Sequence, residues 1–533
     1  MNHQAQAAAP QRRPEWLNIG MIVLAAVVIC STSARPLPAD QPNLIFMISD
    51  DQGWSGLSVP MHPKFSGSAS KVIETPNLQR LADSGMRFSS AYAPAPVCSP
   101  TRVALQLGKS PAQLHWTKAA PPVPGQALVE PTLIKRIPAD EVTFAELLRD
   151  AGYITAHFGK WHLSGGGPGE HGYREHDGDT GNEQAFKFVD PNPVDILGMA
   201  ERAEKLMARS LEEKKPFYIQ LSWNALHASQ NARPATIAKY QKLMPSANEK
   251  AVTTAAISED LDEGVGRVLA AVDRLGLSSN TYVIYMSDNG SGGGGRDGLR
   301  GGKGGVWEGG IRVPLIVRGP GIQAGSWCDV PVVGYDWYPT FCEWAGIASS
   351  KLPEKLEGGS LVAVLTGKQE LGVKRPREGL FFHFPHYQGE GGPQSSIRVG
   401  NLKLIHFYES DEDMLFDLGA DLQERSDLLA QKPEIGKELR TKLDRYLNEV
   451  QAQLPTKNPN YKPNDGSQDP RDDKPGRGAE SGKGTGKVGG GRSNRSRDGG
   501  GSGGSRSGRD RQGAVYGECI VAGDSQDGFT GWL

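Results

Sequence analysis

The sequence predicts an α/β protein with a large, mostly parallel central sheet flanked by helices, and a smaller C-terminal antiparallel sheet followed by a helix. Four short runs are almost continuously apolar, which is typical of strands buried on both faces of a parallel sheet; they are residues 43–49, 153–158, 216–222 and 281–287. Helical patterns lie between these runs, and strands that alternate with helices favour a mostly parallel sheet.

The helical segments have recognisable ends. Residues 75–85 start with Thr75 as a candidate N-cap, carry a proline in the first turn and end at a glycine. Residues 143–152 follow the same plan, and residues 255–276 form a long amphipathic pattern. We expect these helices to flank the sheet.

The pattern changes at about residue 375. Beyond it, four segments predict an antiparallel meander closed by a helix: residues 379–385, 395–407, 413–418 and 433–454. We therefore expect a larger domain over residues 41–375 and a smaller α+β subdomain over residues 376–455.

The N-terminal segment has the layout of a secretory signal peptide over residues 1–34. Arg12 and Arg13 precede an apolar run at residues 19–30, and small residues follow at 31–34. The run is short for a membrane span, so we expect no stable span and export to the periplasm or the exterior. An uncleaved N-terminal anchor is the alternative.

Composition limits the other partners and roles. The formal net charge is −2, so the overall charge gives no reason to expect a nucleic-acid partner. Residues 456–533 are rich in Gly, Ser and Arg and poor in apolar side chains, which predicts a disordered tail. Five cysteines in 533 residues do not form the framework of a small disulfide-rich domain, so Cys98 needs its own explanation.

Polar side chains follow the strand-like runs, and the first set of them offers only oxygen ligands. Asp50 and Asp51 follow the first run, and Asp288 and Asn289 follow the last. Ligand sites gather at the carboxyl ends of parallel strands, so these residues are expected to meet. Either pair alone could be a turn or a helix cap. Together they favour a metal site, because neighbouring carboxylates repel unless a cation separates them, and oxygen ligands suit Ca²⁺ or Mg²⁺.

The second set is cationic and consists of Arg102, Lys160, His162, His227 and Lys303. With a metal, these groups would surround an anion such as a sulfate or phosphate ester and stabilise charge that develops on the transferred group. Each residue alone has an ordinary explanation: His227 as a core histidine, for example, or Lys303 as a loop lysine among glycines.

Cys98 lies between two prolines, ahead of Arg102 and a helical pattern. A buried structural cysteine is the commonest role of this residue type. A nucleophilic thiolate is the next, because a nearby arginine and a helix N-terminus favour the charged form. A soft sulfur nucleophile suits a hard, oxygen-rich site poorly, so the residues alone leave the role of Cys98 open.

The stretch Cys-Ser-Pro-Thr-Arg at residues 98–102 resembles the Cys-x-Pro-x-Arg hallmark of the type I sulfatases, which belong to the alkaline-phosphatase-like superfamily. Further stretches are similar to that family's motifs and occur in its order: residues 42–54, 75–102, 152–163, 287–290, 301–321 and 414–428. The resemblance implies that a formylglycine-generating maturation enzyme oxidises Cys98 to Cα-formylglycine. Its hydrated aldehyde would be an oxygen nucleophile.

The resemblance also implies the role of each site residue. A divalent metal, usually Ca²⁺ in this family with Mg²⁺ as the alternative, would be held by Asp50, Asp51, Asp288, Asn289 and modified Cys98. The sulfate oxygens would be bound by Lys160, His162, His227 and Lys303. Arg102 would steady the modified residue, His162 would assist breakdown of the covalent intermediate, and His227 or Lys303 would protonate the leaving alcohol.

One position departs from the family's pattern: Leu107 stands where threonine is usual, in the segment that the maturation enzyme reads. His386 is expected to reach the substrate. The predicted activity is hydrolysis of a sulfate ester, on a carbohydrate rather than an aryl alcohol. The alternatives are a phosphatase or phosphodiesterase of the same superfamily, and a catalytically silent protein that binds sulfated glycans.

Overall fold

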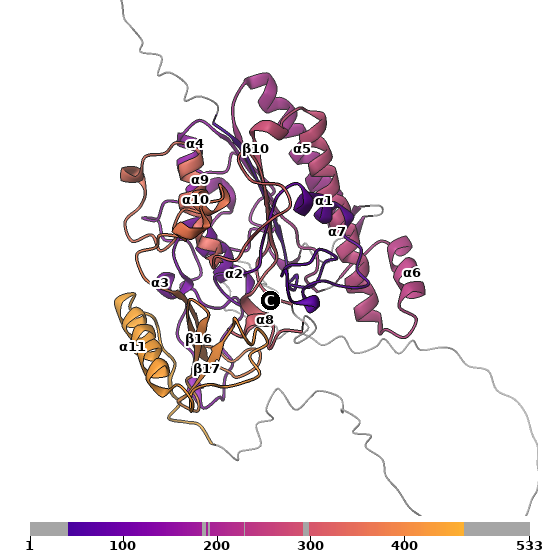
Figure 1. The fold of residues 1–533 in the computed structure, drawn as a ribbon. Helices are drawn as coiled ribbons and strands as arrows, with labels where there is room; N and C mark the ends of the chain where they lie inside the picture. The colour runs from indigo at the N-terminus through magenta and orange to yellow at the C-terminus, as the bar shows by residue number, and fades with distance from the viewer. Residues whose placement is uncertain (1–40, 184–187, 190–191, 229, 292–297, 463–533) are drawn as a thin grey trace, which may run out of the picture. The chain divides into compact units, whose positions relative to one another are not determined.

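A computed structural model describes residues 41–183, 188–189, 192–228, 230–291 and 298–462 (Figure 1). The predicted signal peptide over residues 1–34 and the predicted tail from residue 463 onward lie outside these residues. The predicted tail begins at residue 456, but its first two residues are ordered. They form β18 (Thr456–Lys457), which pairs antiparallel with β4 (Leu128–Val129).

Eight strands form the main sheet, which is mostly parallel, as predicted. β1 (Asn43–Ser49) lies inside the sheet, with β10 (Thr281–Ser287) parallel on one side and β9 (Phe217–Ser222) parallel on the other. The order is β12-β2-β11-β10-β1-β9-β5-β6. The remaining strands are β12 (Ser326–Cys328), β2 (Met86–Phe88), β11 (Leu315–Arg318), β5 (Ile154–Gly159) and β6 (Glu175–His176). Of these, β11 runs antiparallel to both of its neighbours.

Helices cover both faces of this sheet (Figure 1). Successive strand residues point to opposite faces, so Ile45 and Met47 pack with one group of helices, whereas Leu44 and Phe46 pack with the other. The first group comprises α1 (Pro76–Asp83), α5 (Ile196–Glu213), α6 (Pro234–Leu243) and α7 (Glu249–Arg274). The second comprises α2 (Cys98–Leu107), α4 (Phe144–Asp150), α9 (Trp337–Trp344) and α10 (Val362–Leu365).

The helix ends follow local capping chemistry. Thr143 and Glu146 form the capping box that starts α4. α7 starts earlier than predicted, because the side chain of Asn248 accepts a hydrogen bond from the amide of Ala251. Thr75 precedes α1 but makes no side-chain cap bond.

The predicted C-terminal antiparallel sheet is confirmed. It is a meander of β14 (Leu380–Phe384), β15 (Gln394–Val399), β16 (Leu402–Phe407) and β17 (Glu412–Asp417). α11 (Pro433–Glu449) packs on one face of this sheet through an apolar cluster. The other face packs against Trp307 and Ile311, beside and within α8 (Glu308–Ile311). The small sheet therefore supports the segment that carries Lys303.

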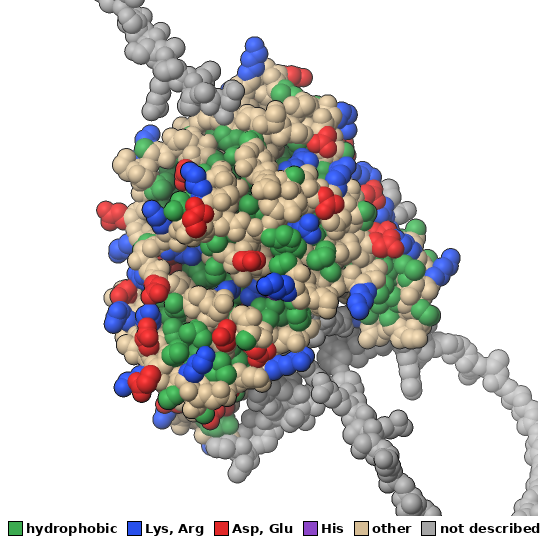
Figure 2. Space-filling model, viewed as in Figure 1, with side chains coloured by type: hydrophobic (Ala, Val, Ile, Leu, Met, Phe, Trp, Pro, Cys, Tyr) green, Lys and Arg blue, Asp and Glu red, His purple; other side chains and the backbone are tan. Residues whose placement is uncertain are grey.

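The shorter elements complete the described part of the chain: α3 (Pro111–Leu114), β3 (Ala91–Tyr92), β13 (Val332–Val333), β7 (Phe188–Val189) and β8 (Asn192–Pro193). None of the helices in the described ranges has the length and apolar character to cross a membrane. On the face in Figure 2, basic and acidic side chains are interspersed, which agrees with the near-zero net charge.

Candidate active site

The carboxyl ends of the central strands bring the predicted residues to one edge of the main sheet. Asp50 directly follows β1, Asp288 directly follows β10 and Lys160 directly follows β5. Backbone hydrogen bonds continue the pairing past the strand ends. The amide of Asp288 donates to the carbonyl of Ser49 (3.0 Å), and the amide of Lys160 donates to the carbonyl of Ser222 (2.7 Å).

Three carboxylates at this edge lie close enough to share one ion. One oxygen from each of Asp50, Asp51 and Asp288 lies within 4.8 Å of the others. The side-chain nitrogen of Asn289 donates to an oxygen of Asp51 (2.7 Å), and the backbone amide of Asp51 donates to an oxygen of Asp288 (3.2 Å). Asp51 has the left-handed backbone conformation (φ 60°), which is uncommon outside glycine and often occurs at functional sites.

Two oxygen atoms of this cluster are buried and make no hydrogen bond among the described residues. They are Oδ1 of Asp50 and Oδ1 of Asn289, and both side chains are 0% exposed. A buried polar atom without a partner costs about 1–3 kcal/mol. Oxygen atoms of this kind are the ligands that Ca²⁺ and Mg²⁺ take, so the residues present fit a divalent metal.

The pKa values of the clustered carboxylates depend on nearby positive charge. Burial raises the pKa of Asp288 to about 8, and the charge of Asp50 acts in the same direction. Burial opposes ionisation of Asp50 as well, but Lys160, followed by His227 and Arg102, holds the pKa of Asp50 well below its usual range. Neighbouring buried carboxylates cannot all ionise without compensating cations, and a divalent metal would supply that compensation.

Arg102 and Lys160 hold two of the carboxylates in place. Arg102 is 2% exposed and donates Nε and Nη2 to one oxygen of Asp288 (3.1 and 2.8 Å). Its Nη1 donates to the carbonyl of Lys160 (2.7 Å). The ammonium of Lys160 lies 2.6 Å from an oxygen of Asp50. These side chains tie the ends of β1, β5 and β10 to α2.

Lys303 reaches the cluster from a glycine-rich loop. Its ammonium lies 2.8 and 2.9 Å from the two oxygens of Asp51. Burial opposes its charge, but Asp51 outweighs burial, together with the charges of Cys98 and Asp50, and the pKa of Lys303 is raised. The side chain is 17% exposed, so Lys303 is a cation at the rim of the cluster.

The two predicted histidines differ in their surroundings. Burial, then the charges of Lys160 and Arg102, lowers the pKa of His162 well below its usual range, which keeps the ring neutral. His227 donates Nδ1 to the carbonyl of Ala228 (2.7 Å). That bond leaves Nε2 as the ring atom for other partners, because no described residue makes a hydrogen bond with it.

Cys98 is the first residue of α2, is 2% exposed and is a free thiol. Electrostatic interactions couple it to Arg102, Asp288 and Lys303, so it belongs to the same cluster. α2 is buried along its whole length, and Leu107 packs in the apolar core.

Thr180 is a supporting residue that the sequence did not reveal. Its hydroxyl donates to the carbonyl of Gly159 (2.5 Å) and accepts from the amide of Trp161 (3.0 Å). Its carbonyl accepts from the amide of His162 (2.7 Å). Thr180 therefore fixes the segment that carries Lys160 and His162, yet a lone threonine in a loop carries no sequence signal.

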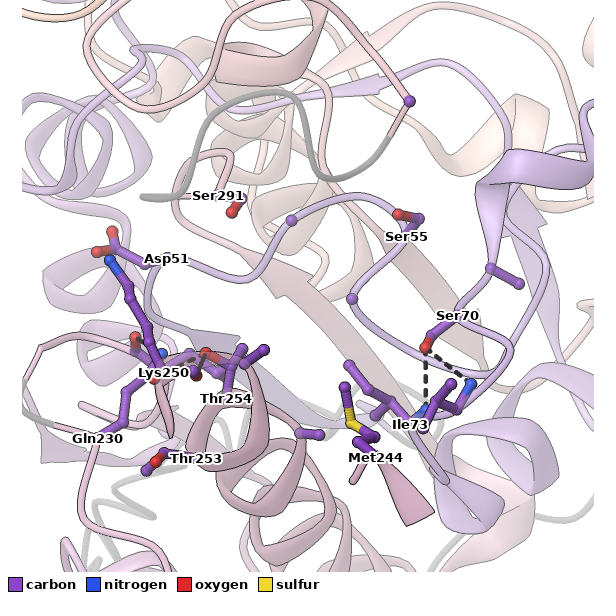
Figure 3. A pocket seen from close by; sticks show the side chains of 18 of the residues that line it. Asp51, Ser55, Ser70, Ile73, Gln230, Met244, Lys250, Thr253, Thr254 and Ser291 are labelled. Carbon is purple, nitrogen blue, oxygen red and sulfur yellow. Dashed lines mark hydrogen bonds between the residues drawn. The ribbon is translucent and has the colours of Figure 1, made fainter. Parts of the chain in front are cut away.

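A cavity of about 1230 Å³ adjoins the cluster. Asp51, His227 and Lys303 line it on the side of the metal cluster, and the rest of the lining comes mainly from residues 53–73 and the first turns of α7 (Figure 3). The lining residues include several hydroxyl and amide side chains, and none of those in the described ranges is Phe, Tyr or Trp.

The structure does not bring His386 into this lining. The side chain is 0% exposed, and its ring nitrogens are bonded to Glu130 (2.8 Å) and Thr117 (2.7 Å). Glu130 also pairs with the ammonium of Lys118 (2.9 Å). Gln388, two residues further along, lines the cavity instead. The turn after β14 thus points its histidine inward and its glutamine toward the cavity.

Comparison with known proteins places these observations in a family. Residues 42–347 match the family model described as Sulfatase, and residues 302–453 match the one described as N-sulphoglucosamine sulphohydrolase, C-terminal. Human arylsulfatase A is 30% identical over 421 residues, covering 70% of this chain and 75% of the relative. The N-acetylglucosamine-6-O-sulfatase of Bacteroides thetaiotaomicron is 26% identical, covering 83% and 92%.

Solved structures agree with the sequence matches. The crystal structure of Ps i-CgsB in complex with k-i-k-neocarrahexaose has a TM-score of 0.63 and 25% identity, covering 76% of this chain and 92% of that one. The residues matched by the Sulfatase family model include the three clustered carboxylates, Cys98 and Lys303. The chain therefore belongs to the sulfatase family, with the alkaline-phosphatase-like fold, and is a sulfuric ester hydrolase.

Proposed function

We propose that the protein hydrolyses a sulfate ester of a carbohydrate, with Cα-formylglycine made from Cys98 and with a bound divalent metal. One observation carries the proposal: three carboxylates and the amide of Asn289, with two unsatisfied buried oxygens among them, lie beside a cysteine that starts a helix. Cations surround this cluster on several sides. Such an arrangement suits an anionic ester better than a neutral one.

The metal would be held by Asp50, Asp51, Asp288 and Asn289, with the residue derived from Cys98 completing the set. Oxygen ligands suit both Ca²⁺ and Mg²⁺; we propose Ca²⁺, because it tolerates an irregular set of ligands, whereas Mg²⁺ demands a stricter octahedral geometry. When bound, the metal would supply positive charge against the charge that develops on the sulfate group. The ammonium of Lys160 keeps Asp50 ionised for this task, and the guanidinium of Arg102 opposes the rise in the pKa of Asp288 that burial and Asp50 cause.

Arg102 also holds the nucleophile in place. It stands four residues after Cys98, which is one turn further along α2, and its bonds to Asp288 and to the carbonyl of Lys160 fix that turn against the cluster. When formed, the hydrated aldehyde would supply the oxygen nucleophile that a thiol lacks. A formylglycine-generating enzyme would be the partner that installs it.

The remaining cations would bind and orient the ester. Lys160, His162, His227 and Lys303 would contact the sulfate oxygens. His162, which burial keeps neutral, can accept a proton. The Nδ1–H of His227 donates to the carbonyl of Ala228, so protonation of the leaving alcohol from Nε2 would require the imidazolium form of His227, and Lys303 is the other candidate donor.

A carbohydrate substrate is supported by the cavity and by the relatives. The described lining has no Phe, Tyr or Trp side chain, and its several hydroxyl and amide groups can hydrogen-bond the hydroxyl groups of a sugar. One relative is named for N-acetylglucosamine, and one structural neighbour was solved with an oligosaccharide. We further propose an exported protein with a signal peptide over residues 1–34, a catalytic domain over 41–375 and a subdomain over 376–455.

Mass spectrometry of the tryptic peptide over residues 88–102, from protein made in its native host, tests the nucleophile. A mass lower by the difference between a CH₂SH and a CHO group is expected. In parallel, ion chromatography would measure free sulfate and free phosphate released from matched sulfate and phosphate esters, with Cys98→Ala as the control.

Sulfate release that needs the modified residue and added Ca²⁺ would support the proposal. Phosphate release in its place would identify a phosphatase or phosphodiesterase of the same superfamily. An unmodified Cys98 in folded, metal-loaded protein that binds sulfated glycans without turnover would point to a silent binder. Leu107→Thr would then be the first substitution to test, because threonine is the usual residue there in the segment that the maturation enzyme reads.

A further inference from the structure

Part of the cavity is built from residues that the proposed reaction does not use. Gln230, Lys250, Thr253 and Thr254 line it next to His227, and we name these four residues the α7 wall. Figure 3 shows them grouped on one side of the cavity, across from Ser70 and Ile73. A binding surface on this wall would meet the part of a substrate that lies beyond the sulfate.

The α7 wall is fixed by a chain of hydrogen bonds. The hydroxyl of Thr254 donates to the side-chain oxygen of Gln230 (2.8 Å) and to the carbonyl of Lys250 (2.7 Å). The side-chain nitrogen of Gln230 donates to the carbonyl of Leu226 (3.0 Å), and Leu226 has a positive φ of 78°. The backbone of Lys250 is therefore tied to the turn that carries His227.

Within the described residues Lys250 forms no ion pair, although the carboxylates of Glu249 and Asp51 line the same cavity. No carboxylate among the described residues pairs with its ammonium, whereas Lys239, on the preceding helix, pairs with both Glu74 and Glu259. In Figure 3 the Lys250 side chain points toward the end of the cavity where Asp51 lies. An exposed lysine with no partner, aimed along a substrate cavity, is available for an anion.

The cavity is also large for a single sulfated sugar. Its volume of about 1230 Å³ exceeds the range of about 300–1,000 Å³ that holds drug-sized ligands. Met244 and Ile73 give it an apolar part, against which the faces of a sugar ring can pack. The cavity therefore has room for a substrate that extends beyond the reacting group.

We propose that Lys250 determines specificity by binding a second sulfate group of the same substrate, while the first one occupies the reaction site. The proposal rests on the proposed function. An ammonium offers three donors in no fixed plane, which matches a tetrahedral oxyanion. A charged hydrogen bond at a partly exposed site corresponds to about tenfold in affinity.

Equilibrium binding measures this effect without turnover. Full-length, Ca²⁺-loaded Cys98→Ala protein would be titrated calorimetrically with glucosamine-2-N,6-O-disulfate and with N-acetylglucosamine 6-sulfate, which differ by the second sulfate. The same titrations would be made after adding Lys250→Met. The matched control adds Lys242→Met, which removes an equally exposed charge from α6 outside the cavity lining.

We expect the disulfate to bind about tenfold more tightly than the monosulfate. Lys250→Met should bring the two affinities within about twofold, and Lys242→Met should leave the preference unchanged. A preference that survives Lys250→Met, or a reference protein that shows none, would overturn the proposal. Failure of the proposed function would appear separately, as an unmodified Cys98 and no sulfate release.

Discussion

Replacing Lys403 by methionine would remove a buried cation from between two buried carboxylates. The ammonium of Lys403 lies 2.8 Å from an oxygen of Glu308 and 2.8 Å from an oxygen of Glu424. The Lys403 side chain is 1% exposed and both carboxylates are 0% exposed. Glu308 starts α8, so this contact joins the small sheet to the segment that carries Lys303.

The expected loss in the free energy of unfolding depends on which of the two carboxylates still has a partner after the substitution. Glu308 retains Arg312, whose Nε lies 2.6 Å from its second oxygen. Among the described residues, the Glu424 side chain retains only the backbone amide of Glu308 (2.7 Å). Removing one member of a buried ion pair costs about 3–5 kcal/mol, because an uncompensated charge stays behind. We expect Lys403→Met to lower the free energy of unfolding by that amount.

The chain offers a matched control in α11. The ammonium of Lys442 also contacts two carboxylates, those of Glu378 (2.8 Å) and Glu438 (3.0 Å), but its side chain is 28% exposed. Exposed pairs contribute about 0–1 kcal/mol each, so Lys442→Met should cost far less. Adding Glu424→Gln to Lys403→Met should recover most of the loss, because it removes the stranded charge.

Urea unfolding followed by tryptophan fluorescence would measure these differences at pH 8 and pH 5. Burial raises the pKa of Glu424 to about 7 even with Lys403 present, and removal of the lysine raises it further. A carboxyl group whose pKa is higher in the folded state than in the unfolded state stabilises the protein when protonated. The deficit of Lys403→Met should therefore shrink at pH 5. Equal losses for the two lysine variants, or a deficit that grows in acid, would refute the reasoning.

Three further predictions concern the metal cluster, a close backbone approach and a buried histidine. Calcium at about 100 times its Kd should stabilise the protein by about 2.7 kcal/mol in thermal shift assays, and Asp51→Asn should abolish that shift; an equal shift in both proteins would argue against the cluster. Gly290→Ala places a Cβ 2.0 Å from the carbonyl oxygen of Gly309, so it should destabilise by about 1–3 kcal/mol, whereas Gly305→Ala, whose nearest contact is 3.3 Å, should cost less. Burial lowers the pKa of His383 to about 4, so below pH 6.5 the unfolded state binds a proton that the folded state does not. The free energy of unfolding should therefore fall by about 3 kcal/mol between pH 6.5 and pH 4. A His383→Gln variant whose free energy of unfolding depends on pH in the same way would contradict this.

The central strands, and the carboxylates that meet at their ends, could be predicted from the sequence because their signals are local. β1 and β10 are buried on both faces, so their apolar runs match the strands residue for residue. Asp50 and Asp288 directly follow these strands, and parallel strands place their carboxyl ends at one edge. The role expected for Cys98 rests on the family resemblance, because no physical property of a cysteine predicts its conversion to formylglycine.

The edge strands could not be predicted in the same way. β2, β11 and β12 are short, and β11 runs antiparallel between β10 and β2. Their pairing partners lie far away in the chain, so their extended conformation depends on contacts that no local pattern encodes. The histidine at position 386 shows the same limit, since its burial against Glu130 and Thr117 depends on a segment more than two hundred residues earlier.

What the sequence alone determined was the alternation of elements, the oxygen and cation sets that follow the central strands, and the C-terminal meander. These depend on burial patterns and on residue order, which are properties of the chain itself. Only the tertiary structure decided which charges pair, which of them are buried, and which line the cavity. Lys250 and Lys403 are both ordinary lysines in the sequence. Folding places Lys250 in the cavity lining without an ion pair among the described residues, and buries Lys403 between two carboxylates. These environments differ because each is assembled from segments that are distant in the sequence.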